Sequence, residues 1–416
     1  MMRVIADDLT GACDVGAELA AAGLAVRVSV AGEGGDEDPH VLRVLNTQSR
    51  AIAAHTAYAR VLQLLHHRPA DVLVKKIDTA LRGHLGAELD AALDGLGAVA
   101  AFVLPAVPGA GRLTRDGCQW FGGRPLDATE FASDPEGPGA ESSIATVLAR
   151  ESRRRTEVIG TAVLRSGGLA ERARRLMRAG AEFFVVDAES DADLTCAVSA
   201  ILELPRPLCV AGSIALARAV APHLTCESMQ HTAYAARPIS HPALVVCGSL
   251  HPMARAQIEA LVAAGLAVSV AAPSPAAPAV ERAAAAARAG AQLGAGGTVV
   301  LAPAPHSGTP DASARRATER LLAELTRQIA GRAAMPTLVL VGGETAHAVL
   351  TALGATELAV HGSFGPLVAV GEILTGTAVG ATLVTKGGSG GEPGSLVELL
   401  ASATAVKSAA MRQRAM

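Results

Sequence analysis

The sequence predicts an α/β protein of two domains, each a mainly parallel sheet with flanking helices, with the active site in the interdomain cleft. With 416 residues the chain is too long for one hydrophobic core, since cores stop growing at about 250–300 residues. Short apolar runs also alternate with helical patterns along its whole length. Half of the residues are apolar but only 2% are aromatic, so small aliphatic side chains must build both cores.

In the first part of the chain, apolar strands are each followed by polar residues. The expected elements are strands over Arg3–Ile5, Val41–Leu45, Val72–Val74 and Ala101–Leu104, with a helix over Ala12–Ala22. Ligands of open α/β sheets lie at the carboxyl ends of the strands. We therefore expect the polar residues after these strands to gather at one edge of a sheet.

The strand and helix alternation continues to the end of the chain. Further strands are expected over Glu182–Val186, Pro207–Ala211, Ala243–Cys247, Ala267–Val270, Thr298–Leu301, Thr337–Val341, Leu367–Ala369 and Ala381–Val384, and an alanine-rich helix over Val280–Ala291. The pattern breaks only in a polar, proline-bearing stretch between Leu224 and Pro242. The sequence thus predicts domains of residues 1–235 and 236–416.

Charge and cysteine usage exclude several kinds of partner. The formal net charge is -3 and basic residues are spread thinly, so no nucleic-acid partner is expected. The six cysteines include no CxxC pair, which favours free thiols over zinc or disulfides. Without a signal peptide or a long apolar run, we expect a cytoplasmic protein with no membrane partner. The oligomeric state stays open, a homo-oligomer included.

Two adjacent carboxylates, Asp7 and Asp8, follow the first strand where a helix begins. Carboxylates there can bind sugar hydroxyls or act as a base. The alternative is that Asp8 or Thr10 only caps the helix. Phosphatases of the haloacid dehalogenase type also use an aspartate after their first strand, but one residue separates their two aspartates.

The next polar segment crowds two ammonium groups, a carboxylate, a hydroxyl and a guanidinium at one strand end. These are Lys75, Lys76, Asp78, Thr79 and Arg82. An arginine fork matches a carboxylate, and lysine suits developing phosphoryl charge. Asp78 can accept the proton of an attacking hydroxyl. The alternative is a surface network of ion pairs without function.

Other loops add weaker signals. Arg50, at the end of another strand, offers a second guanidinium for an anionic substrate. The segments Pro105–Gly117 and Gly123–Pro135 are expected to be loops, stiffened by proline and opened by glycine.

In the second half, Cys247–Pro252, Val341–Leu350 and Val384–Gly391 each place glycines directly after an apolar strand. Bare backbone N–H groups next to a helix start suit phosphate. In the second of these segments Thr345 is expected to cap the helix. The chain has no GxxxxGK[ST] and no GxGxxG after its first strand, which disfavours a P-loop kinase and a Rossmann dehydrogenase.

Taken in order, these segments resemble the four-carbon acid sugar kinase family, which includes 3-oxo-tetronate, D-threonate and D-erythronate kinases. The resemblance covers nearly the whole chain and rests on IADDLTGA, KKIDTALRG, PAVPGAGR, CGSLHP, GGETAHAVL and VTKGGSGG. It implies a substrate domain followed by a nucleotide domain, and transfer of the γ-phosphoryl group of ATP to the terminal hydroxyl of a four-carbon sugar acid.

The resemblance also implies roles for residues. The acceptor would be bound by Asp8, Arg50, Lys75 and Thr79, and ATP by Ser249, Gly342, Gly343, Glu344, Thr345 and Gly388. Mg²⁺ would be held largely through ATP, with no dedicated protein ligands. The sequence departs from the family at Ala80, in a KIDST-like motif, and at Gly387–Gly391, where an SGNFG-like loop is usual.

As a mechanism we expect domain closure to bring the γ-phosphate to the acceptor. Asp78 is the preferred base and Asp8 its rival, Lys76 and Arg82 stabilise the phosphoryl charge, and Arg50 anchors the carboxylate. Two other functions stay open. One is a nucleotide-regulated sugar-acid binding protein that has lost catalysis, and the other is a phosphatase that uses Asp7 or Asp8.

Overall fold

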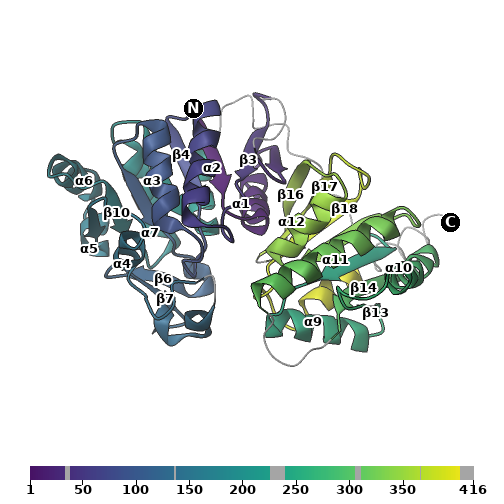
Figure 1. Cartoon of the computed structure of the whole chain (residues 1–416). Coiled ribbons are helices and arrows are strands. Elements are labelled where there is room, and N and C mark those ends of the chain that lie inside the picture. Colours follow the sequence, from purple (N-terminus) through teal and green to yellow (C-terminus); the bar gives the residue numbers. More distant parts are fainter. Residues whose placement is uncertain (33–37, 135–136, 225–238, 305–310, 366, 403–416) are drawn as a thin grey trace, which may run out of the picture. The chain divides into compact units, whose positions relative to one another are not determined.

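The computed structural model describes residues 1–32, 38–134, 137–224, 239–304, 311–365 and 367–402. The chain forms two compact units (Figure 1). The first comprises Met1–Ala22 and Arg43–Gln230, and the second comprises Gly23–Leu42 and His231–Met416. The expected boundary between residues 235 and 236 lies outside the described residues. Each unit is an α/β layer structure, as the sequence predicted.

The first unit contains a parallel sheet with strand order β3-β1-β4-β11-β5-β10-β9. Its strands are β1 (Met2–Ala6), β3 (Leu42–Asn46), β4 (Val72–Lys76), β5 (Ala101–Leu104), β9 (Thr156–Ile159), β10 (Phe183–Val186) and β11 (Leu208–Gly212). Because all neighbours are parallel, the carboxyl ends of β1, β3, β4 and β5 face the same edge. Of these strands only β9, which is partly exposed, was not predicted.

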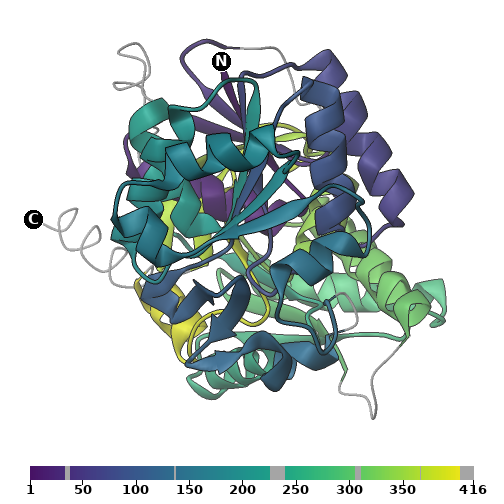
Figure 2. The ribbon, with the colours of Figure 1, turned by 90° about the vertical axis from the view of Figure 1, so that its left-hand side faces the viewer.

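Helices cover both faces of this sheet. They are α1 (Leu9–Ala21), α2 (Ala54–His67), α3 (Leu85–Leu96), α4 (Ile144–Ala149), α5 (Thr161–Arg165), α6 (Leu169–Arg178), α7 (Asp191–Leu202) and α8 (Ile214–Leu224). Helix α3 packs against α2 and α4, while α8 packs against α1 and α7. Figure 2, in which this unit faces the viewer, shows helices on either side of the strands.

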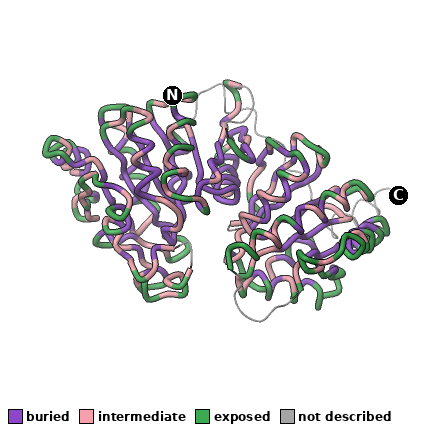
Figure 3. Tube along the Cα trace, viewed as in Figure 1, coloured by how far each residue is buried: buried purple, intermediate pink, exposed green. Residues whose placement is uncertain are grey.

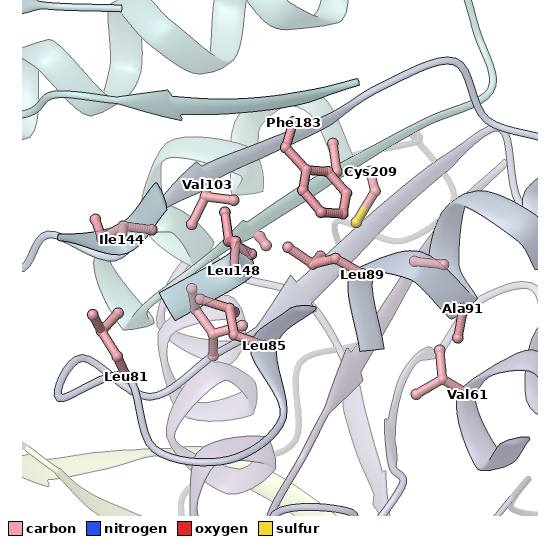
Figure 4. Packing of buried hydrophobic residues seen from close by; sticks show 14 of the residues in the cluster. Val61, Leu81, Leu85, Leu89, Ala91, Val103, Ile144, Leu148, Phe183 and Cys209 are labelled. Carbon is pink, nitrogen blue, oxygen red and sulfur yellow. The ribbon is translucent and has the colours of Figure 1, made fainter. Parts of the chain in front are cut away.

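Aliphatic side chains fill the space between α3 and the sheet. Leu85 and Leu89 of α3 belong to one buried cluster with Val103 of β5 and Phe183 of β10 (Figure 4). Leu81, from the loop between β4 and α3, belongs to the same cluster. The core therefore fixes the loop that carries the most strongly charged segment of the sequence.

A small antiparallel sheet occupies part of the chain that was expected to be loop. Its strands are β6 (Arg112–Arg115), β7 (Cys118–Phe121) and β8 (Arg124–Pro125), flanked by the short 3-10 helices η1 (Pro108–Ala110), η2 (Leu126–Ala128) and η3 (Glu130–Ser133). The turn from β6 to β7 is Asp116–Gly117, with φ of 50° and 70°. Asp-Gly favours this left-handed hairpin turn, so the sequence did carry a signal for it.

The second unit has a sheet with order β13-β14-β12-β15-β18-β17-β16-β2. Its strands are β2 (Val26–Ser29), β12 (Ala243–Cys247), β13 (Val268–Ala272), β14 (Thr298–Pro303), β15 (Thr337–Val341), β16 (Glu357–Gly365), β17 (Val368–Ile373) and β18 (Thr382–Lys386). In this order β13, β14, β12, β15 and β18 pair in parallel with their neighbours. Strands β17, β16 and β2 follow, and each pairs antiparallel with the strand before it. Strands β2 and β16 were not predicted.

The helices of the second unit are α9 (Pro252–Ala263), α10 (Ala279–Gly294), α11 (Ala312–Ala330) and α12 (Gly343–Ala352). In each unit the strands are largely buried and the outer faces of the helices are exposed, as Figure 3 shows. Among the described helices, none combines the length and the apolar character needed to cross a membrane.

Candidate functional site

The carboxyl ends of β1, β3 and β4, together with α3, carry a group of ionisable residues that we call the charged cluster. Its members are buried or half-buried: Asp7, Asp8, Arg50, Lys75, Lys76, Asp78, Arg82 and Glu88. Strand register brings them together, because Ala6 of β1 pairs with both Asn46 of β3 and Lys76 of β4. The structure thus gathers the polar residues that the strand pattern predicted to share an edge.

Arg50 is held by the two aspartates that follow β1. Its Nε and Nη2 atoms each donate to a carboxylate oxygen of Asp7 at 2.9 Å, and Nη2 lies 2.7 Å from Oδ1 of Asp8. Burial alone would raise the pKa of Asp7, but the charges of Arg50 and Lys75 outweigh burial and keep that pKa below its usual value. Asp7 and Arg50 are therefore an ionised, bidentate pair inside the protein.

Asp8 also caps helix α1. Its Oδ1 accepts from the backbone N–H of Gly11 at 3.0 Å, and its Oδ2 accepts from the hydroxyl of Thr10 at 2.6 Å. Asp8 therefore does cap the helix, as the alternative interpretation proposed, and it contacts Arg50 at the same time. A Cβ at Gly11 would lie 2.5 Å from Oδ1 of Asp8 and 3.3 Å from Nζ of Lys76, so glycine lets these two side chains approach.

The two lysines of β4 differ in their surroundings. Lys75 is fully buried, and its Nζ lies 2.6 Å from Oε2 of Glu88, whose other oxygen accepts from Ser49. Burial lowers the pKa of Lys75, but Glu88 and Asp7 more than restore it, so the lysine stays charged. Lys76 donates to the carbonyl of Ile77 at 2.9 Å and makes no ion pair with any described residue. Lys76 is the better placed of the two to meet an anionic ligand.

Asp78 and Arg82 form a second bidentate pair. The carboxylate accepts from Nε and Nη2 of Arg82 at 3.0 and 2.8 Å, and from the backbone N–H of Ala80 at 2.9 Å. Burial would raise the pKa of Asp78, yet Arg82 keeps it well below its usual value. Leu81 between them has φ of 57°, a left-handed conformation that leucine rarely adopts. The buried Leu81 side chain holds this turn, and the turn sets the geometry of the pair.

Sequence reasoning did not select Arg112, which the structure places against the same segment. Its Nη1 donates to the hydroxyl of Thr79, and its guanidinium lies 4.5 Å above the ring of Phe121 and 5.7 Å from that of Phe131. Burial lowers the pKa of Arg112. The residue stands in the quoted PAVPGAGR segment, but its aromatic neighbours follow only from the hairpin.

Asp14 is a second residue that was not selected. It lies on α1 one turn after Thr10, and its carboxylate accepts no hydrogen bond from the described residues. Burial raises its pKa from 3.8 to about 7, with Lys76 acting in the opposite direction and Asp8 and Glu18 adding to the increase. The available signal was an acidic side chain in the middle of a helix whose other residues, apart from Glu18, are mostly small and apolar.

Three glycine-bearing segments of the second unit converge at the carboxyl ends of neighbouring strands. We call residues 248–251, 342–345 and 387–391, which follow β12, β15 and β18, the glycine loops. Ser249 lies between the other two loops. A Cβ at Gly388 would fall 2.0 Å from its Oγ, and one at Gly342 would fall 3.5 Å from its Cβ. The three predicted loops therefore form one surface of closely approaching backbone.

The start of α12 differs in detail from the sequence-based expectation. Gly342, with φ of 107°, is the N-cap and supplies no side-chain hydrogen bond, so Thr345 is not the cap. The Thr345 side chain is buried instead, and a Cβ at Gly248 would lie 2.4 Å from its Oγ1. Gly343 and Glu344 open the helix. The start of α12 therefore lies within the glycine loops, and the positive end of a helix dipole favours an anion.

Lys386 is a further residue that sequence reasoning passed over. It ends β18, its side chain is buried, and its Nζ donates to the carbonyl of Gly387 at 2.9 Å. Its own carbonyl accepts from the N–H of Gly342 at 2.9 Å. Lys386 therefore ties two of the glycine loops together and brings a positive charge to them.

Comparison with protein families matches each half of the chain to a described domain. Residues 2–220 match the sugar-binding N-terminal domain, and residues 244–396 match the nucleotide-binding C-terminal domain. The chain belongs to the four-carbon acid sugar kinase family. The charged cluster lies in the first matched range and the glycine loops lie in the second.

Curated relatives agree with this membership. A D-threonate kinase of Salmonella typhimurium is 31% identical over 96% of this chain and 97% of its own length. Another, from Bordetella bronchiseptica, is 34% identical over 95% of each chain. A 3-oxo-tetronate kinase of Methylobacterium radiotolerans is 32% identical over 52% of this chain and 54% of its own. The predictions of this family and of a kinase are confirmed.

Solved structures support the fold. A chain from Salmonella typhimurium LT2 has a TM-score of 0.77 at 21% identity and covers 97% of this chain and 98% of its own. A Haemophilus influenzae protein has a TM-score of 0.71 at 19% identity, over 97% of this chain and 99% of its own. At these identities the likeness shows the fold alone, and the predicted α/β fold class is confirmed.

Proposed function

We propose that this protein transfers the γ-phosphoryl group of ATP to the terminal hydroxyl of a four-carbon sugar acid, and that D-threonate is its first candidate acceptor. The relatives that match nearly the whole chain carry the name D-threonate kinase. The observation that carries the proposal is the chemical contrast between two regions. A charged cluster lies in the range matched as sugar-binding, and bare backbone loops lie in the range matched as nucleotide-binding.

On the acceptor side, Asp8 and Thr79 offer oxygen atoms to the hydroxyls of the sugar acid. Arg50 holds the carboxylates of Asp7 and Asp8 in place, because two of its nitrogens already bind them. Lys75 acts through Glu88 as a buried support. Lys76 and Arg82 supply positive charge toward the phosphoryl group as negative charge spreads over its oxygens.

The glycine loops fit a triphosphate. A Cβ at Gly388 would lie 2.0 Å from Oγ of Ser249, so glycine lets the backbone of this loop come close to Ser249. ATP would be held by Ser249, Gly342, Gly343, Glu344, Thr345 and Gly388, and it would supply the phosphoryl group. No group of three or more metal-binding side chains occurs among the described residues. We therefore propose that Mg²⁺ enters with ATP and is held by phosphate and water oxygens.

The proton of the acceptor hydroxyl must leave as the new O–P bond forms and the bond to ADP breaks. Asp78 is the proposed acceptor of this proton, with Asp8 as the rival. The pKa of Asp78 lies well below its usual value because Arg82 binds both of its oxygens. A weak base suffices here, since a loose phosphoryl-transfer transition state needs alignment and charge neutralisation more than early deprotonation.

A panel assay tests the proposal. The protein is incubated with ATP, Mg²⁺ and D-threonate, L-threonate, D-erythronate or a 3-oxo-tetronate, and ADP and the phosphorylated acid are measured. We expect ADP release that depends on an acceptor, with the highest kcat/KM for D-threonate. Binding of ATP and acid without ADP release would indicate the regulated binding protein instead. Release of phosphate from a sugar-acid phosphate without nucleotide would indicate the phosphatase.

A further inference from the structure

Two arginines of the same short strand, Arg112 and Arg115 of β6, stack on aromatic rings but differ in their ionic partners. Arg115 lies 5.6 Å from the ring of Trp120, and its Nε lies 2.5 Å from a carboxylate oxygen of Glu189. Arg112 stacks on Phe121 and has no carboxylate within ion-pair distance among the described residues. The charge of Arg115 is therefore balanced by Glu189, whereas the charge of Arg112 is not balanced by a direct ion pair with a described residue.

The surroundings of Arg112 favour a planar anion. The rings of Phe121 and Phe131 cover the guanidinium and leave its N–H edge for hydrogen bonds. A guanidinium carries five N–H donors, and the neutral hydroxyl of Thr79 takes one of them. Burial lowers the pKa of Arg112, although Asp78 acts in the opposite direction. No described carboxylate lies within ion-pair distance of this partly desolvated cation, so binding of an anion is favoured here over binding of a neutral group.

The two arginines of the charged cluster, Arg50 and Arg82, already use their paired N–H donors to bind carboxylates of the protein. Nε and Nη2 of Arg50 are bound by Asp7, and the same two atoms of Arg82 are bound by Asp78. Each of these forks already faces a carboxylate. Arg112 is thus the guanidinium next to this cluster whose fork is not filled by a described acidic residue.

We propose that Arg112 binds the carboxylate of the sugar acid with two N–H groups, while Thr79 fixes the orientation of the guanidinium. The inference rests on the proposed function and deepens it, since it assigns the group that distinguishes a sugar acid from a neutral sugar. Arg112 contacts the substrate, whereas Phe121 and Phe131 position it. The ligand class is a short hydroxycarboxylate.

The test compares D-threonate with its neutral amide, D-threonamide, as acceptors for wild-type protein and Arg112→Gln. Loss of a charge-assisted interaction should raise the KM for D-threonate about 10- to 100-fold. The KM for ATP should stay within about twofold, and the kcat/KM for the amide should fall much less than that for the acid, because the amide lacks the carboxylate. Arg112→Lys keeps the charge but loses the planar pair of N–H donors, so its KM for D-threonate should lie between those of wild type and Arg112→Gln.

Arg115→Gln is the matched control, because it removes a stacked arginine from the same strand whose charge Glu189 already balances. It should leave the preference for acid over amide unchanged. An unchanged KM for D-threonate in Arg112→Gln would overturn the inference. So would a loss of that preference in Arg50→Gln while Arg112→Gln retains it.

Direct binding separates failure of this inference from failure of the proposed function. Calorimetry measures the Kd of D-threonate for wild type and for Arg112→Gln, and circular dichroism verifies that the variant is folded. If wild type binds the acid without phosphorylating any acceptor, the kinase proposal fails, while a weaker Kd in Arg112→Gln still supports Arg112. An equal Kd in the two proteins overturns the role of Arg112. A wild type that neither binds nor phosphorylates the acid overturns both.

Discussion

The charged cluster and the glycine loops build binding surfaces in opposite ways. In the charged cluster, side chains carry the chemistry, and the buried charges of Asp7, Lys75 and Asp78 are paired within the protein. In the glycine loops, the chemistry comes from the backbone, and side chains are kept away at positions such as Gly342 and Gly388. We expect changes in the charged cluster to lower folding stability, and changes in the glycine loops to weaken only the proposed nucleotide binding.

This contrast has a physical origin. Burying a charge without a partner costs several kcal/mol, so removing one member of a pair destabilises the fold as well as the site. At the glycines of these loops no charge is removed by a substitution, and a small side chain added there acts by local steric conflict. Stability and activity should therefore change together in the charged cluster and separately in the glycine loops.

The largest effect is expected when Asp78 loses its charge. Asp78→Asn should lower kcat about 10²- to 10⁴-fold, because the amide cannot accept the proton of the acceptor hydroxyl. Asp134→Asn is the control, since Asp134 lies at 3.6 Å from Arg82 and is the weaker partner of the same arginine. Steady-state kinetics with saturating ATP and D-threonate measure both. Near-normal turnover of Asp78→Asn would remove Asp78 from the role of base.

The next effect concerns stability. Arg50→Gln should lower the free energy of unfolding by about 3–5 kcal/mol, because it leaves the buried carboxylates of Asp7 and Asp8 without their cation. Arg255→Gln is the comparison, since Arg255 and its partner Glu259 have 57% and 67% of their side chains exposed. That change should cost less than about 1 kcal/mol. Urea denaturation measures both, and equal losses would refute the contrast.

The effect of Asp14 depends on pH. Burial raises its pKa from 3.8 to about 7, so the folded protein binds this proton more tightly than the unfolded chain does. Below about pH 4 both states are protonated and no stability is lost. As the pH rises toward 7 the unfolded chain ionises first, and above pH 7 the full cost of about 2–4 kcal/mol is reached.

Asp14→Asn removes this cost. The variant should be more stable than wild type by about 2–4 kcal/mol at pH 8 and nearly equal to it at pH 4. Urea denaturation at the two pH values checks the difference. A gain that does not change with pH would show that Asp14 has an ordinary pKa.

The smallest effect belongs to the glycine loops. In Gly388→Ala the new Cβ would lie 2.0 Å from Oγ of Ser249, so the loop must shift. The KM for ATP should rise about 10- to 100-fold, which corresponds to about 1.4–2.8 kcal/mol. The Kd for the sugar acid and the melting temperature should hardly change. Gly294→Ala, at the end of α10 with no atom within 4 Å of the added Cβ, should change none of these values.

Much of the fold was predictable because buried parallel strands appear as continuous apolar runs. Strands β1, β4 and β12 were found within one or two residues of their ends. Strand β2 was not found, because its four residues alternate between apolar and polar side chains over too short a run to give a clear signal. The hairpin at Asp116–Gly117 was missed although its turn chemistry was present in the sequence.

The members of the charged cluster were predictable as residues, but their pairings were not. Asp7 and Arg50 are 43 positions apart, and their contact depends on how the segment after β3 returns to the end of β1. There the backbone N–H of Ser49 donates to the carbonyl of Asp7 at 2.9 Å. The aromatic support of Arg112 likewise depends on the register of β6 with β7. Such contacts follow from strand register, which a single sequence does not specify.

The membership of Gly23–Leu42 in the second unit has a consequence for biosynthesis. Strand β2 pairs with β16, whose residues are synthesised more than 300 positions later, as the register of Val28 with Leu358 shows. The growing chain must therefore leave one side of β2 without its partner strand until β16 has been synthesised. Cutting the gene near codon 235 would separate β2 from β16, so a second unit expressed alone would need residues 23–42 supplied as a fused or added peptide.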